Sequence, residues 1–148
     1  MAAAHEFPKR PVPAVGAIVF RGSQVLLVRR RDPPSQGRWS IPGGAVEVGE
    51  TVEQAVVRET REETAVEVRP REVVAVADFI EKEGARIRWH YVLVDLLCVH
   101  IRGEPFAGSD AENARFIETR ELGDLDLAPT ALRVIERALI ARRQGPDA

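Results

Sequence analysis

The chain has 148 residues, of which 45% are hydrophobic and 30% are charged, as is typical of one globular domain with a hydrophobic core. Its formal net charge of -2 argues against a general nucleic-acid-binding surface, so we expect no stable nucleic-acid partner. No hydrophobic run approaches the roughly 18 residues that cross a membrane, and residues 1–9 lack the apolar centre of a signal peptide, so we expect a cytoplasmic protein.

The N-terminal part of the chain predicts a β-hairpin preceded by a flexible segment. Residues 1–13 are small, polar and proline-bearing, and we expect them to be loosely ordered. Residues 14–20 and 24–30 are aliphatic and rich in β-branched side chains, with Gly22 in the short connection between them. This pattern favours two antiparallel strands joined by a tight turn.

A loop, a short strand and a turn follow the hairpin. Residues 32–37 contain two prolines and a glycine, which is typical of a loop. Residues 38–41 predict a short strand. Pro42-Gly43-Gly44 ends that strand, and we interpret this tripeptide as a turn.

A helix is predicted from Thr51 to Thr64. Thr51 and Gln54 have the Thr-x-x-Gln spacing of a capping box, and no glycine or proline interrupts the residues that follow. At about 100° per residue, one broad face carries hydrophobic side chains first and carboxylates one turn later. The residues on that face are Val52, Ala55, Val56, Glu59, Glu62 and Glu63.

The carboxylates on this inward face require an explanation, because a buried anion needs a cation or takes up a proton. Arg58 can pair with Glu62 at the i, i+4 spacing, which leaves Glu59 and Glu63 without a partner. Clusters of carboxylate oxygens suit hard cations such as Mg²⁺ and Mn²⁺. An acidic, solvated helix end is the alternative, and the helix taken by itself leaves both interpretations open.

The chain after the helix predicts two long strands. Residues 66–80 indicate one strand, or a bent pair interrupted near Pro70. Residues 81–84 indicate a turn, and residues 87–101 a long, strongly apolar strand. Cys98, the single cysteine, lies in that run, cannot form a disulfide within the chain, and is interpreted as a small buried hydrophobic residue.

The C-terminal part predicts a loop, a short strand and a second helix. Residues 102–113 carry glycines, a proline and several acids, which is typical of a loop. Residues 114–117 indicate the last strand. Residues 129–142 predict a helix with a proline in its first turn and three side chains directed to the core: Leu132, Ile135 and Leu139.

The segment from Gly44 to Val66 resembles the Nudix box, whose pattern is Gly-x5-Glu-x7-Arg-Glu-U-x-Glu-Glu-x-Gly-U, where U is a bulky aliphatic residue. Thr60 departs from the pattern at an aliphatic position on the flank of the helix, and Ala65 departs where glycine is usual. Alanine in a left-handed cap would cost about 1 kcal/mol. Both departures leave the charged positions intact. The matching residues are Gly44, Glu50, Arg58, Glu59, Glu62, Glu63 and Val66.

This resemblance implies a fold and a reaction. The fold would be α/β, a Nudix-type α/β/α sandwich with a mixed β-sheet between helices, spanning residues 14–143 and followed by a frayed tail of residues 144–148. The reaction would be the metal-dependent hydrolysis of a pyrophosphate bond in a nucleoside diphosphate linked to another moiety, with Mg²⁺ or Mn²⁺ as cofactor. The layout of residues 11–19, 37–44 and 109–112 is similar to the ADP-ribose pyrophosphatase-like branch.

Two alternative functions stay open. The first is a nucleoside triphosphate pyrophosphohydrolase that removes damaged nucleotides. The second is a non-catalytic module of the same fold that senses a ligand, although such a module could lose the charged positions that this chain keeps. Each function implies a small nucleotide as ligand, and the resemblance leaves a homodimer open.

The resemblance also assigns roles to the charged residues of the box. Glu59, Glu62, Glu63 and the carbonyl of Gly44 would hold the metal, and Arg58 would orient the carboxylates. Glu62 or an acid from the loop beyond the box would take the proton from the attacking water. Glu112 is the first choice for that acid and Asp110 the second.

Four residues are candidates for contacts with the substrate. In the resembled family an arginine leaving the second strand often faces the phosphates, and we place Arg30 ahead of Arg29 in that role. Trp39 could stack on a base, although packing in the core is the favoured alternative. His90 could contact the substrate, although a single histidine in a strand more often has a structural role.

Overall fold

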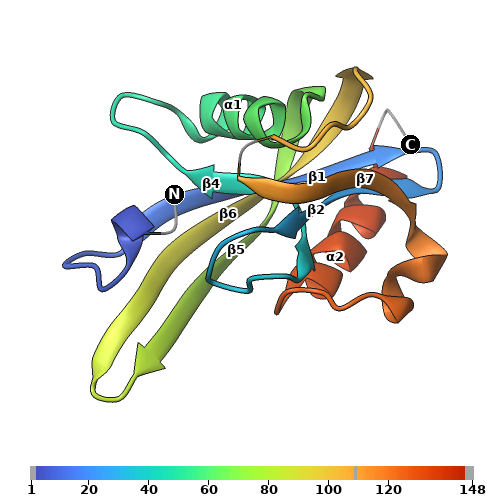
Figure 1. The fold of residues 1–148 in the computed structure, drawn as a ribbon. Helices are drawn as coiled ribbons and strands as arrows, with labels where there is room; N and C mark the ends of the chain where they lie inside the picture. The colour runs from blue at the N-terminus through green and yellow to red at the C-terminus, as the bar shows by residue number, and fades with distance from the viewer. Residues whose placement is uncertain (1–2, 109, 146–148) are drawn as a thin grey trace.

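The computed structural model describes residues 3–108 and 110–145 (Figure 1). These residues form a seven-stranded sheet with the order β3-β2-β1-β6-β5, while β4 pairs with β1 and β7 pairs with β2. The strands are β1 (Val12–Arg21), β2 (Gln24–Arg30), β3 (Trp39–Ser40), β4 (Gly43–Ala45), β5 (Glu67–Glu83), β6 (Arg86–Arg102) and β7 (Ala111–Glu118). The helices are η1 (Ala3–His5), α1 (Val52–Thr64), η2 (Thr119–Asp124) and α2 (Ala131–Arg143).

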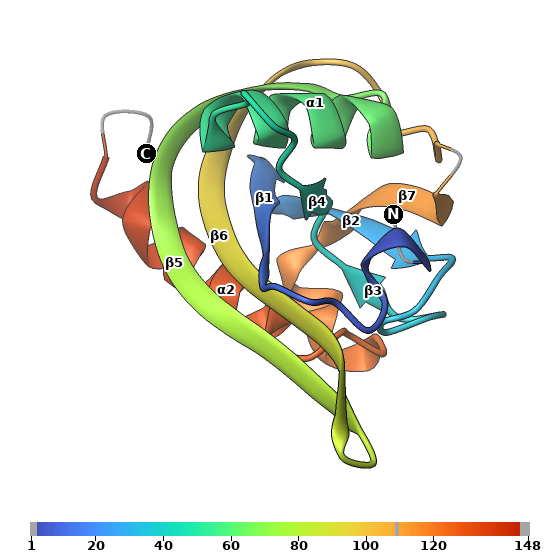
Figure 2. The ribbon, with the colours of Figure 1, turned by 90° about the vertical axis from the view of Figure 1, so that its left-hand side faces the viewer.

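The sheet is mixed and lies between the two long helices, which confirms the predicted α/β/α sandwich. β1 runs parallel to β6 and antiparallel to β2 and β4. Figures 1 and 2 show α1 over one face of the sheet and α2 over the other. Because side chains alternate along a strand, Val15 and Val19 of β1 pack in the cluster that contains α1 residues, while Ile18 and Phe20 pack in the cluster that contains α2 residues.

β4 is the first difference from the sequence-based expectation. The Pro42-Gly43-Gly44 segment was expected to be only a turn, yet Gly43 and Gly44 pair with Gly16 and Val15 of β1. A Cβ atom on Gly43 would lie 2.0 Å from the Val15 carbonyl oxygen. Glycine is therefore required for the two strands to approach this closely, and the pairing holds the backbone of β4 under α1.

β5 and β6 form a long hairpin that extends well beyond the rest of the sheet (Figure 1). Residues 81–83 continue β5, so the predicted turn is confined to Gly84 and Ala85, where Gly84 has a φ of 63°. Pro70 shifts the register between the strands without ending β5. Near the tip of this hairpin, the amide of Phe7 in the N-terminal segment donates a hydrogen bond to the carbonyl of Arg88 at 2.8 Å.

The two long helices begin close to the predicted positions. Thr51 caps α1 through the expected capping box with Gln54. α2 begins at Ala131, after Thr130 in the left-handed region, rather than at residue 129. Ile135 is buried and Leu139 packs against the core, whereas Leu132 is 42% exposed, contrary to expectation. The inward face of α2 consists of Ala131, Val134, Ile135 and Ala138.

Cys98 is buried in the cluster between the sheet and α1, as predicted, and burial raises the pKa of its thiol to about 12. It therefore remains an uncharged packing residue. No helix in the part of the chain that the structure describes has the length and apolar character needed to cross a membrane.

Candidate active site

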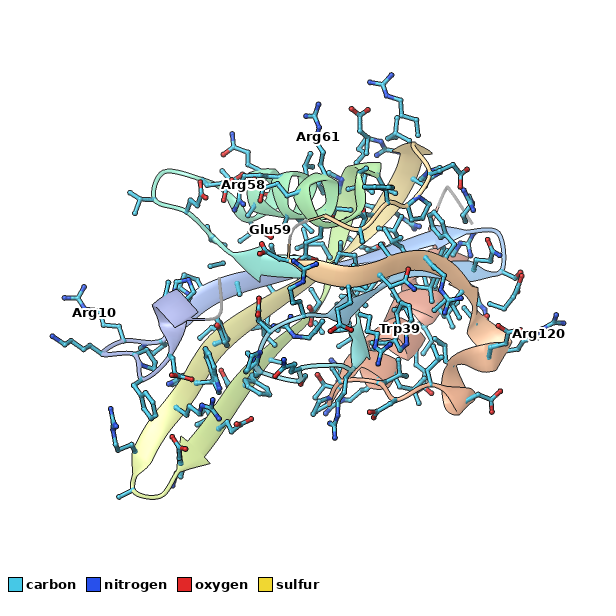
Figure 3. All side chains as sticks on the ribbon, viewed as in Figure 1. Arg10, Trp39, Arg58, Glu59, Arg61 and Arg120 are labelled. Carbon is cyan, nitrogen blue, oxygen red and sulfur yellow. The ribbon has the colours of Figure 1, made fainter. Side chains whose placement is uncertain are left out.

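α1 places two of its three box carboxylates toward the sheet. Figure 3 shows Glu59 on the side of α1 that faces β4. The Glu59 side chain is 13% exposed, and Glu63, one turn later, is partly buried. Glu62 lies at the edge of this face, and its side chain is 59% exposed. The expectation that all three carboxylates point inward is therefore wrong for Glu62.

Arg58 organises the acidic residues around it. Its guanidinium donates to both carboxylate oxygens of Glu50 at 2.7 and 2.8 Å, and to the carbonyl of Ala45 at 3.0 Å. Its Nη1 also donates to Glu59 at 2.8 Å and to Glu62 at 3.2 Å. The helix pattern suggested that Glu59 has no partner, but Arg58 is its partner in the structure. Arg58 fixes the carboxylates in position rather than acting on a substrate.

The charge of Arg58 also settles the role of Glu50. Hydrogen bonds from Arg58 hold the pKa of the Glu50 carboxyl at about 2, and the pKa of the guanidinium is raised in turn. The amide of Glu47 donates a further hydrogen bond to Glu50 at 3.0 Å. Glu50 therefore belongs to the scaffold that anchors Arg58, and the loop before α1 is tied to the second turn of the helix.

Glu63 is the least compensated anion of the site. The amide of Gly43 donates to its Oε2 at 3.2 Å. Burial, followed by repulsion from Glu59, raises the pKa of Glu63 to about 8. Burial also raises the pKa of Glu59, against the opposing effect of Arg58. Two carboxylates that disfavour joint ionisation, held side by side, are a ready site for a cation.

The backbone of β4 lies directly against these carboxylates. A Cβ atom on Gly44 would lie 2.4 Å from the carboxyl carbon of Glu59. Only glycine at residue 44 therefore allows the Glu59 carboxylate to lie this close to β4. Within residues 3–108 and 110–145, no three His, Cys, Asp or Glu side chains lie close enough together to hold a metal ion by themselves.

This arrangement nevertheless fits a divalent cation. Mg²⁺ is commonly bound through one or two carboxylates together with waters and substrate phosphates, rather than by a complete protein cage. Glu59 and Glu63 would supply the two carboxylates, and the backbone carbonyl of Gly44 would supply a further oxygen ligand. Glu62 would have to turn from Arg58 to join them.

A cavity of about 120 Å³ opens beside Gly43 and Gly44, between the sheet and the start of α2. Arg30 lines this cavity, and its Nε donates a hydrogen bond to the carbonyl of Pro34 at 2.6 Å. The positive charge of Arg30 opposes part of the rise in the pKa of Glu63. Arg29 points elsewhere, toward Glu112 at 3.4 Å. The structure thus brings Arg30, and not Arg29, to the cavity beside the carboxylates.

The remaining predicted residues lie away from this cavity. Trp39 is buried in the core beneath α2, with the guanidinium of Arg115 5.0 Å from its ring centroid, so its faces are covered. His90 lies between Trp89 and Tyr91 on β6 and therefore points to the opposite side of the strand from them. Neither lines the cavity, and the burial of Trp39 agrees with the core packing that was favoured for it.

The loop beyond the box contributes Asp110 rather than Glu112. Glu112 lies in β7, where it forms an ion pair with Arg29. Asp110 lies near enough to Glu59 and Glu63 for its charge to raise the pKa of both. The second choice for the additional acid is therefore closer to the carboxylate pair than the first.

Tyr91 and Asp95 both line the cavity from β6, and neither was predicted as a site residue. A signal for Asp95 was present, because it is the one charged residue in the hydrophobic run from Tyr91 to Val99. An acid in a strand that is otherwise apolar requires a partner or a function. The strand pattern alone could not show which side of the sheet carries the cavity.

Comparisons with known proteins agree with this geometry. The family model of the NUDIX domain matches residues 10–138. The chain is 36% identical over 115 residues to an ADP-ribose pyrophosphatase of Methanocaldococcus jannaschii, covering 78% of this chain and 66% of that protein. It is 37% identical over 116 residues to a putative 8-oxo-dGTP diphosphatase 2 of Mycobacterium tuberculosis, covering 77% of each.

The fold has solved counterparts as well. A MutT NUDIX hydrolase from Burkholderia pseudomallei matches with a TM-score of 0.77 at 27% identity, covering 87% of this chain and 98% of that one. The chain spans about half to two thirds of the length of several curated relatives that it matches.

Proposed function

This chain belongs to the NUDIX domain family, and from that premise we propose that it hydrolyses a pyrophosphate bond in a nucleoside diphosphate linked to another moiety. ADP-ribose-like compounds are the favoured substrates. The observation that carries the proposal is the pair of partly buried carboxylates, Glu59 and Glu63, held against the glycines of β4 beside a cavity. The name of the Methanocaldococcus jannaschii relative supports the choice of substrate.

Divalent metal ions are generally used by this family, and an ion bound here would supply positive charge against the pyrophosphate and lower the pKa of bound water. We propose that Glu59 and Glu63 hold Mg²⁺ or Mn²⁺ together with the Gly44 carbonyl, and that Glu62 completes the set. Arg58 holds Glu59 in position, and Glu62 gives up its 3.2 Å hydrogen bond to Arg58 when it joins the ion. Arg30 meets the phosphates from the cavity side, where its guanidinium already faces negative charge.

Glu62 is our choice for the group that takes the proton from the attacking water. It is the exposed member of the cluster, and its hydrogen bond to Arg58 is long enough at 3.2 Å to be exchanged for another partner. Asp110 is preferred to Glu112 as the additional acid, since its charge reaches both buried carboxylates. Water attack then gives two phosphate products, and the proton passes to the carboxylate.

A nucleoside triphosphate pyrophosphohydrolase is the second candidate, favoured by the 37% identity to the putative 8-oxo-dGTP diphosphatase. The non-catalytic ligand-sensing module has less support, because the complete Arg58 network would be unnecessary in a protein that only binds.

One screen separates these candidates. Purified protein is incubated with ADP-ribose, other nucleoside diphosphate sugars, dinucleoside polyphosphates and nucleoside triphosphates, with Mg²⁺, Mn²⁺ or EDTA. We expect AMP and ribose 5-phosphate from ADP-ribose, only in the presence of metal. Preferred release of pyrophosphate from triphosphates would instead select the second candidate, and no turnover on any substrate would favour the binding module.

Two variants connect the activity to the site. Glu59→Gln and Glu63→Gln should each lower turnover by several orders of magnitude while the protein remains folded by circular dichroism. Glu53→Gln is the matched control, because Glu53 lies on the exposed side of the same helix. Turnover close to that of the wild type in either site variant would contradict the assignment.

A further inference from the structure

Asp95 is a buried acid that the proposed chemistry does not use. It lies in the middle of β6, is only 4% exposed, and lines the cavity beside Gly43 and Gly44. Its carboxylate has no hydrogen-bond or charge partner among the residues that the structure describes. Burial alone raises the pKa of Asp95 to about 6. An acid without a partner at such a position is costly to the fold, so it requires a ligand-based explanation.

The neighbouring strand is shaped to keep this carboxylate open to the cavity. Gly16 of β1 pairs with Asp95, and a Cβ atom on Gly16 would lie 2.3 Å from Asp95 Oδ1 and 2.6 Å from Ile41 Cδ1. Any side chain at residue 16 would therefore cover the acid. The Gly16 site leaves the carboxylate at the floor of the cavity with an apolar side chain next to it.

The other walls of the cavity are mostly apolar. Phe79, Tyr91 and Leu93 line it from β5 and β6, while Pro129 and Val134 line it from the start of α2. Tyr91 is held in place by the Trp89 ring, which stacks at 14° with ring centroids 6.3 Å apart. Apolar walls that include the aromatic rings of Phe79 and Tyr91 suit a planar ring whose edge carries a few polar groups.

The position of the cavity matches a nucleotide that extends to the carboxylate pair. Asp95, Gly16 and Gly43 lie in one row across β6, β1 and β4. Two strand spacings separate the ends of this row, roughly 10 Å. Arg30 lines the same cavity and lies close enough to both Tyr91 and Glu63 for its charge to lower their pKa values. A ligand could therefore reach from Asp95 to Arg30 and the metal-binding carboxylates.

On the basis of the proposed function, we propose that this cavity holds the nucleobase of the substrate and that Asp95 determines specificity by accepting a hydrogen bond from an exocyclic amine. Adenine and cytosine carry such an amine, whereas hypoxanthine and uracil carry a carbonyl at the equivalent ring position. An ionised carboxylate accepts hydrogen bonds and repels a carbonyl oxygen. Sites built to bond one polar group reject the analogue that lacks it.

Nucleotide binding without metal tests this inference separately from hydrolysis. Affinities of ADP, IDP, CDP and UDP for the full chain are measured in EDTA by ligand-observed NMR up to millimolar concentrations. We expect ADP to bind about 10- to 100-fold more tightly than IDP, and CDP more tightly than UDP. This ratio corresponds to the free energy of one hydrogen bond to a charged group. Equal affinities within each pair, or no binding of any of the four, would overturn the inference.

Asp95→Asn and Leu93→Met assign the discrimination to the acid. Asn retains the shape of Asp95 but can donate as well as accept, so the ADP and IDP affinities should become similar. Leu93→Met alters the cavity wall without adding a polar group. It should therefore weaken the binding of ADP and IDP equally and preserve the ratio of their affinities. An ADP preference that survives in Asp95→Asn, or an equal loss for both nucleotides, would show that the acid does not read the base.

The outcomes for hydrolysis are distinct. Discrimination between ADP and IDP in a protein that hydrolyses no pyrophosphate would preserve the base site and reject the proposed function. Metal-dependent hydrolysis of ADP-ribose by a protein that binds ADP and IDP equally would support the proposed function and reject the base site. The wild-type comparison needs no variant, so it stands even if Asp95→Asn fails to fold.

Discussion

Glu63 receives its only hydrogen bond among the described residues from the backbone amide of Gly43, at 3.2 Å. One neutral donor does not compensate for burial beside the charge of Glu59, and the pKa of Glu63 rises to about 8 as a result. In the metal-free protein at pH 7, Glu63 therefore holds a proton. A cation that binds between Glu59 and Glu63 has to displace that proton.

The first prediction is that metal binding releases a proton below pH 8. The apparent affinity for Mg²⁺ or Mn²⁺ should rise about tenfold for each pH unit between pH 6 and 8 and level off above the pKa of Glu63. Isothermal titration in two buffers of different ionisation enthalpy measures the protons released. Affinity that does not change with pH, with no proton released at pH 7, would contradict the argument.

The second prediction concerns the stability of the metal-free protein. Because the folded-state pKa of Glu63 lies above its ordinary value of 4.5, its contribution to stability is fully present below pH 4.5 and is lost as the pH rises to about 8. Glu63→Gln removes this titration. In EDTA at pH 8.5, the variant should therefore melt at a higher temperature than the wild type, by several degrees.

The same pair of proteins at pH 4 provides the control for this prediction. Both side chains are then neutral, so the two melting temperatures should converge. A variant that melts below the wild type at pH 8.5 would mean that Glu63 is stabilised by its surroundings. That result would also remove the electrostatic reason for a cation site.

The third prediction uses Gly44. A methyl group at this position would meet the Glu59 carboxyl carbon at 2.4 Å, so Gly44→Ala should displace Glu59 and weaken metal binding and turnover about 10- to 100-fold or more. Gly123→Ala is the matched control, because a Cβ atom there meets nothing within 4 Å. Metal titration and steady-state kinetics on both variants decide the point. Equal behaviour of the two variants would argue against close packing of β4 and α1.

Local signals predicted much of this fold. The capping box of α1 and the hairpin of β1 and β2 each depend on residues close together in the sequence, so a short pattern is sufficient. The left-handed cap at Ala65, whose φ is 63°, was expected from the glycine that the Nudix box has at this position. Thr60, at the aliphatic position of the box, packs in full burial, and its hydroxyl donates a hydrogen bond to the carbonyl of Val56 at 2.7 Å.

The parts that could not be predicted depend on contacts between distant residues. β4 exists because Gly43 fits against Val15, which lies 28 positions earlier in the printed sequence. Glu59 has a cationic partner because Arg58 also bonds to Glu50, a geometry that helix periodicity does not encode. The cavity became visible only when β6 and the start of α2 were placed together, and it contains Asp95 in place of Trp39 and His90.

The fourth prediction is that Asp95 limits the stability of the ligand-free protein. Its folded-state pKa of about 6 lies above the ordinary value of 3.8, so stability is fully present below pH 3.8 and decreases as the pH rises through 6. The loss amounts to about 3 kcal/mol at neutral pH. Asp95→Asn should therefore raise the free energy of unfolding at pH 7.5 by up to that amount and leave it nearly unchanged at pH 4.

Urea denaturation at the two pH values measures this difference directly. A stabilised variant that has lost the preference for ADP would identify Asp95 as a residue retained for ligand recognition at the expense of stability. A variant destabilised at pH 7.5 would show that the carboxylate has structural partners in solution.

The fifth prediction tests the exit of α1. Ala65 adopts a φ of 63°, its amide bonds to the carbonyl of Arg61, and the next segment turns into β5. Ala65→Gly relieves the left-handed strain, so it should stabilise the protein by up to about 1 kcal/mol, less the added freedom of glycine in the unfolded chain.

The amides of Phe106 and Gly108 donate to the carbonyls of Thr64 and Glu63 at 2.8 Å, so the loop that leads to Asp110 is fastened to this end of the helix. Denaturant unfolding together with kinetics distinguishes the outcomes: greater stability with unchanged kcat would mean that the helix exit is separate from catalysis, whereas lower kcat would mean that this exit positions Asp110.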